Sequence, residues 1–187
     1  MGAVRYLRGF IPWIAFAAIS TVGWQWGALA ALVSGVWLLA KDRRSGVAAD
    51  ALILETSTVA YFAAMTAFAF AVPHSPVRTY AGALSLGWLA ATAWSTLAVR
   101  RPFTLGIARR STPQEVWHTP QFLRVNMVIT TAWATGFALT AAAVAACDAA
   151  HTGPLATTVC QVVGFVAPAV FTNRYPKIVQ ARLGVTR

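Results

Sequence analysis

One acidic residue, Glu55, lies inside a stretch of sequence long enough to cross a membrane. From Asp50 to Val72 the remaining residues are almost all apolar or carry small hydroxyl groups. A carboxyl group in hydrocarbon is paired with a cation, protonated or directly involved in function, because an isolated charge there is energetically costly. Three roles stay open for Glu55: a general acid or substrate-binding group, one half of an ion pair with an arginine at the cytoplasmic end of the membrane, and a proton or cation site in a transporter.

Asp50 precedes Glu55 by five residues, which corresponds to about 7.5 Å along a helix. If desolvation keeps Glu55 neutral, its carboxyl group can donate a proton, and Asp50 can tune that group or restore its proton. We therefore take Glu55 and Asp50 as candidate catalytic residues.

Aromatic and hydroxyl side chains recur at helical spacing inside three of the apolar stretches. Polar groups that face lipid have no partner there, so these stripes indicate a shared interior cavity, although close helix packing explains them as well. Trp π faces in such a cavity would stabilise positive charge on a substrate. The candidate substrate-binding residues are Phe62, Trp88, Thr92, Trp94, Asn126, Thr130 and Trp133.

Six apolar segments must position these groups. Hydrophobic residues make up 58% of the chain and charged residues 11%, and a hydrocarbon core of about 30 Å requires roughly 20 helical residues. The composition predicts an all-α, polytopic membrane protein in which residues 1–187 form a single domain, a compact bundle of six transmembrane helices. The predicted segments are 10–23, 25–40, 50–72, 79–99, 120–147 and 155–172.

The distribution of basic residues predicts the orientation of these helices. If the amino terminus is cytoplasmic, all 15 Lys and Arg residues except Arg78 fall on the cytoplasmic side, as the positive-inside rule requires. Both termini are then cytoplasmic, in a bacterial inner membrane. Arg5 and Arg8 lead into the first segment without a cleavage motif, so we expect that segment to be retained. The net charge of +10 suits anionic lipid headgroups, and we expect no nucleic-acid partner.

The connection from residue 100 to residue 119 is predicted to be a structured cytoplasmic loop. Thr112-Pro113-Gln114-Glu115 has the form of a capping box with proline at the first helical position, which predicts one or two turns of interfacial helix. Thr119-Pro120 again combines a capping residue with proline at the first helical position, where the next apolar segment begins. The basic side chains around this loop suit a phosphate or lipid headgroup, and ordinary juxtamembrane positive charge is the alternative explanation. They are Arg100, Arg101, Arg109, Arg110, His118 and Arg124.

Cys147 and Cys160 flank a short loop on the predicted outer side of the membrane. An oxidising exterior permits a disulfide between them, and two unpaired thiols are the alternative. The three histidines are scattered along the chain, and the sequence contains no H-E-x-x-H, G-x-S-x-G or glycine-rich phosphate-binding motif. We therefore predict no metal site and no cofactor.

Several motifs resemble a known group of proteins. Phe10-Ile11-Pro12, Arg101-Pro102-Phe103-Thr104 and the later Trp117, Pro120, Phe122 and Asn126 resemble small bacterial inner-membrane proteins related to intracellular septation protein A. The resemblance covers about half of the chain and implies a compact polytopic helical protein, without catalytic residues to carry over. In size, tryptophan content and sparse intramembrane acids, the chain is also similar, at the level of class, to small integral-membrane terpene cyclases.

Three functions follow from these observations. The first is an enzyme acting on a lipophilic, isoprenoid-like substrate, a terpene cyclase in which Glu55 donates the initiating proton and tryptophans stabilise the carbocation. The second is a small oligomeric transporter or channel coupled to protons or cations, and the third is a cell-envelope scaffold. The expected partners are membrane lipids and a lipophilic small molecule, and the sequence leaves homo-oligomer formation open.

Overall fold

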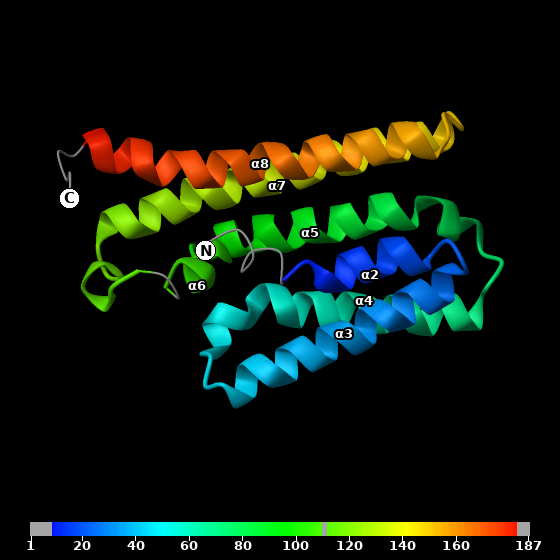
Figure 1. Ribbon diagram of the computed structural model, residues 1–187, viewed down its shortest axis with the longest axis horizontal. Helices are drawn as coiled ribbons and strands as arrows, with labels where there is room; N and C mark the ends of the chain where they lie inside the picture. The colour runs from blue at the N-terminus through cyan, green and yellow to red at the C-terminus, as the bar shows by residue number, and fades with distance from the viewer. Residues whose placement is uncertain (1–8, 110–111, 183–187) are drawn as a thin grey trace. The chain divides into compact units, whose positions relative to one another are not determined.

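The computed structural model describes residues 9–109 and 112–182 of the chain (Figure 1). Over these residues the protein contains seven α-helices, three short 3₁₀ turns and no strand, which confirms the predicted all-α class. The chain divides into two compact units, Met1–Thr79 and Tyr80–Arg187, and the single membrane domain stays a prediction. Each unit is therefore described by itself.

From residue 9 onward the first unit contains three α-helices, and α3 packs against both of the others. These helices are α2 (Ile11–Ile19), α3 (Trp24–Arg44) and α4 (Ile53–Ala71), with a 3₁₀ turn over Ala49–Leu52 before α4. A second 3₁₀ turn, Pro76–Tyr80, follows α4.

An aromatic cluster forms the core of the first unit. The Phe62 side chain on α4 is fully buried, and its ring centroid lies 4.7 Å from that of Trp13 and 5.5 Å from that of Phe16, both on α2. Tilted aromatic pairs of this kind add to the stabilisation gained from burial. At the other end of the unit the Trp24 indole donates a hydrogen bond of 2.8 Å to the Pro73 carbonyl oxygen, which ties the start of α3 to the end of α4.

The second unit is built around α7, which packs against α5, α6 and α8 (Figure 1). Its helices are α5 (Ala81–Ala98), α6 (Thr104–Arg109), α7 (Pro120–Ala149) and α8 (Pro154–Arg182), with a 3₁₀ turn over Gln114–Val116. The Thr119 hydroxyl caps α7 by accepting a hydrogen bond from the Phe122 N–H, and Pro120 occupies the first helical position. This part of the capping prediction is confirmed.

The six predicted segments overlap α2, α3, α4, α5, α7 and α8. By length and composition, three described helices can cross a membrane: α4, α7 and residues Pro154–Val179 of α8. The last segment was predicted to end near residue 172, but α8 continues to Arg182 through Pro168 and Pro176. Basic residues such as Arg174 and Lys177 favour the carboxyl-terminal turns of a helix, because they compensate the negative end of its dipole.

Small residues set the distance between α7 and α8. A Cβ atom added to Gly164 would overlap the Thr140 side chain, and one added to Gly136 would lie 2.7 Å from Cγ of Pro168. The two backbones therefore approach each other where side chains are absent, as in the small-residue interfaces of membrane helices. The buried Trp133 indole also donates a hydrogen bond of 2.9 Å to the Thr172 hydroxyl across the same interface.

We predict that Gly164→Ala destabilises the protein by about 1–3 kcal/mol, because the new methyl group overlaps Thr140 and forces α7 and α8 apart. Thermal unfolding in mild detergent measures the change. Gly87→Ala on α5 is the matched control, since beyond the adjacent residues and backbone of α5 no atom lies within 4 Å of the added Cβ, and alanine is the better helix former. Equal losses of stability in the two variants would contradict the assigned interface.

Candidate functional site

An open groove of about 930 Å³ runs along the interface of α7 and α8. Its walls combine apolar side chains with a few hydroxyl groups, and the Cys160 thiol lies in its lining. The lining residues include Met127, Thr131 and Leu139 on α7, and Val163, Ala167 and Phe171 on α8. Both helices are long and apolar enough to cross a membrane.

Two hydroxyl groups that line this groove donate hydrogen bonds to their own helix. The Thr131 hydroxyl donates to the Met127 carbonyl oxygen at 2.9 Å, and the Thr140 hydroxyl donates to the Gly136 carbonyl oxygen at 2.7 Å. Such back-bonding lets threonine face an apolar environment without leaving its donor unpaired. The groove therefore offers a largely apolar surface on which hydroxyl oxygens still have lone pairs to accept a hydrogen bond.

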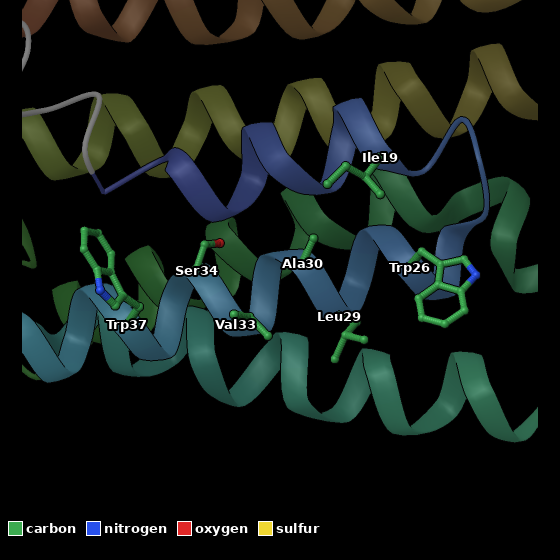
Figure 2. A pocket seen from close by; sticks show the side chains of 7 residues that line it. All are labelled: Ile19, Trp26, Leu29, Ala30, Val33, Ser34 and Trp37. Carbon is green, nitrogen blue, oxygen red and sulfur yellow. The ribbon is translucent and has the colours of Figure 1, made fainter.

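A second, smaller groove of about 660 Å³ lies on the first unit (Figure 2). Ile19 of α2 contributes to it, and the other lining residues belong to one face of α3. Figure 2 shows Trp26 and Trp37 at opposite ends of this row. The Trp26 ring meets Phe70 edge-on at 5.3 Å, and the Lys41 ammonium lies 5.1 Å from the centre of the Trp37 ring. Aromatic and basic groups in this arrangement suit the level of lipid headgroups.

The candidate acid Glu55 is half-buried in the first turn of α4. A carboxylate at this position is favoured by the positive end of the helix dipole. Glu55 lines neither groove. Asp50 lies in the 3₁₀ turn that precedes α4, and its side chain is outside the described part of the structure.

Asp42 lies near the end of α3, where the sequence led us to expect a solvated carboxyl group. Its side chain is only 6% exposed, although it stands among basic residues at a helix end. Helical spacing could have predicted the burial of Asp42, because this residue continues the buried face formed by Ala31, Gly35 and Leu38. The α3–α4 end of the first unit therefore holds a buried and a half-buried carboxyl group.

None of the predicted substrate-binding residues lines either of the two grooves described above. Phe62 belongs to the core of the first unit, whereas the other members of the set belong to the second unit. The Trp88 and Trp94 side chains on α5 are 41% and 47% exposed. Trp133 is buried against Phe137 and Phe165, with ring centroids 5.3 Å and 5.1 Å away.

Asn126 and Thr130 take part in a buried hydrogen-bond network that fastens α6 to α7. The Thr104 hydroxyl on α6 donates to the main-chain carbonyl oxygen of Asn126 at 3.1 Å and lies 2.8 Å from the Thr130 hydroxyl. All three side chains are nearly inaccessible to solvent. Sequence reasoning marked these polar residues as inward-facing but missed α6, whose six residues are too few for a clear periodic pattern. Thr92 on α5 is buried as well.

The basic connection after α5 is ordered by its backbone. Arg100 adopts the left-handed conformation, with φ of 54°, and its N–H donates to the Leu97 carbonyl oxygen. The Arg101 N–H donates to the Thr96 carbonyl oxygen, which completes a Schellman motif at the end of the helix. Both arginine side chains are exposed.

The residue before the turn over Gln114–Val116 is Pro113, and no side chain caps this turn. The Thr112 hydroxyl donates to the Ala108 carbonyl oxygen at 2.7 Å instead of capping a helix, and a single 3₁₀ turn follows it. Trp117 anchors the segment, since its indole donates to the Thr112 carbonyl oxygen and the Arg109 guanidinium lies 5.5 Å from its ring centre. His118 and Arg124 are exposed, and Arg110 lies outside the described residues.

These features define an all-helical protein with three helices able to span a membrane and with apolar grooves on its surface. Within the described residues, no group of three or more His, Cys, Asp or Glu side chains is arranged to hold a metal ion. No protein-family model, curated protein or solved structure matches the chain. The resemblance to septation-protein relatives therefore stays a prediction.

Proposed function

We propose that this protein is a multi-pass membrane protein that binds an elongated lipophilic, isoprenoid-like molecule in the α7–α8 groove. The observation that carries the proposal is the groove itself, about 930 Å³ of largely apolar surface along two helices apolar enough to span a membrane. Its volume lies in the range of small-molecule sites, which is about 300–1,000 Å³.

In the proposed topology all six predicted segments cross the membrane, and not only the three helices that are long and apolar enough by themselves. Basic residues lie at the ends of α3 and α8 and just after the end of α5, while Arg78 lies between α4 and α5. Six crossings with cytoplasmic termini place all of those helix ends on the cytoplasmic side of a bacterial inner membrane. The nine residues of α2 reach about 13.5 Å, so this topology requires local thinning of the bilayer or a longer helix.

Affinity in such a groove would come from shape and a few polar contacts. A lipophilic molecule gains little hydrophobic free energy on leaving lipid for an apolar groove, because both environments lack water. Dispersion contacts in a well-shaped groove and a hydrogen bond to a hydroxyl oxygen would then select the ligand. The exposed Thr131 hydroxyl already donates to its own helix, so its oxygen offers an acceptor to a ligand hydroxyl group.

We predict that a photoreactive prenol crosslinks to α7 and α8 in lipid vesicles, and that Ala132→Phe, which fills the groove, lowers capture at least fivefold. Peptide mapping by mass spectrometry measures the labelled positions. The matched control is Ala138→Phe, on an exposed position of α7 outside the groove. Equal capture by the two variants, or labelling spread evenly over all helices, would argue against a binding site in this groove.

Catalysis is a second candidate, favoured by the half-buried Glu55 carboxyl group in the first turn of α4. In a cyclase, this acid would protonate an alkene or epoxide, the carbocation would add to a second double bond, and loss of a proton would give a cyclic product. Proton-coupled transport uses the same residue, whereas a cell-envelope scaffold does not need it.

For the catalytic candidate we predict that Glu55→Gln leaves the thermal midpoint within a few degrees of the original but abolishes conversion of a polyprenyl substrate to its cyclic isomer. The amide is similar in shape but cannot supply the proton. Gas chromatography with mass spectrometry of membrane extracts measures the product. Glu115→Gln on an exposed turn serves as the control. Unchanged turnover in the Glu55 variant would refute its role as the acid, and loss of proton-dependent flux instead would favour transport.

A further inference from the structure

We propose that Cys147 and Cys160 form an intramolecular disulfide that joins the ends of α7 and α8 next to the loop between them. The sequence left this pairing open against two unpaired thiols. Both side chains are free and half-buried in the structure, and the two thiols lie within hydrogen-bonding reach of each other. The proposal does not depend on what the groove binds.

The register of the helix pair brings the two cysteines together. Contacts between α7 and α8 advance by about one helical turn at a time toward the connecting loop. They pair Trp133 with Thr172, Gly136 with Pro168, and Thr140 with Gly164. One further turn on each helix brings Cys160 opposite Val144, and Cys147 follows Val144 by three residues on the same face of α7.

The directions of the two side chains compensate for the three-residue offset between Cys147 and Val144. Cα–Cβ bonds in an α-helix tilt toward its amino terminus. On α8 that tilt carries Cys160 toward the loop, because the helix begins at Pro154. On α7 it carries Cys147 away from the loop, toward the level of Val144. The two side chains therefore converge from opposite directions along an antiparallel pair.

The end of α7 is held in place independently of the thiols. The Thr152 N–H donates to the Cys147 carbonyl oxygen, and the His151 N–H donates to the Asp148 carbonyl oxygen, which forms a Schellman motif. His151 adopts the left-handed conformation with φ of 52°. An ordered turn of this kind lowers the conformational cost of bringing the sulfur atoms to bonding distance.

The reaction requires an external disulfide oxidant, such as a dithiol–disulfide oxidoreductase. The thiolate of one cysteine attacks the oxidant disulfide, which forms a mixed disulfide and releases one oxidant thiol. The thiolate of the second cysteine displaces the other oxidant thiol and forms the Cys147–Cys160 bond. Two protons and two electrons leave the cysteine pair, and the oxidant is reduced to its dithiol.

The test uses the full chain purified in mild detergent under reducing conditions. The protein is treated with oxidised glutathione, blocked with N-ethylmaleimide and weighed intact by mass spectrometry. We expect a monomer that has lost two hydrogen atoms and carries no maleimide, and that gains two maleimides after reduction. The chain contains only these two cysteines, so the pairing is unambiguous.

Cys147→Ser and Cys160→Ser are the matched controls, and each should keep one thiol that reacts with maleimide or glutathione. The oxidised original protein should unfold about 5 °C or more above its reduced form, because the crosslink restrains the unfolded chain. Two maleimides on the oxidant-treated protein, or a crosslink only between two chains, would overturn the proposal.

Discussion

The absence of a side chain at Gly164 is the constraint on which the second unit depends. Thr140 occupies the space that a Cβ atom would need, and Gly136 faces Pro168 one turn further along the same contact. Membrane helices gain little from burying apolar surface against one another, so close packing and interhelical hydrogen bonds must hold them together. The contact at these small residues fixes the register of α7 and α8, and that register determines both the groove between them and the position of their cysteines.

The helix α7 connects the remaining parts of the second unit. One hydrogen-bond network fastens α6 to it through Thr104, and the Trp133 indole joins it to α8. These polar contacts lie in a largely apolar interior, where an unpaired donor would be costly. Much of the polar stripe along α7 thus serves to attach the neighbouring helices. The part of the stripe that remains available to a ligand is the hydroxyl groups in the groove.

The sequence predicted the helices well because apolar composition and helix caps are local properties. Thr119 and Pro120, for example, start α7 through a cap that needs no distant residue. The sequence did not predict which aromatic residues are buried, because a turn of about 100° per residue decides which way each side chain faces. Trp133 is enclosed and Trp94 is largely exposed, although both lie well inside apolar segments. The groove could not be predicted from the sequence either, since it depends on how α7 and α8 cross.

The central claim is that the α7–α8 groove faces lipid hydrocarbon, and site-directed spin labelling in vesicles tests it most directly. Val163→Cys, in a background of Cys147→Ser and Cys160→Ser, places a nitroxide on a groove residue that is 60% exposed. We predict that spin relaxation responds strongly to oxygen, which concentrates in the bilayer, and weakly to a water-soluble nickel chelate. A dominant response to the nickel chelate would show that the groove faces water and would contradict the claim.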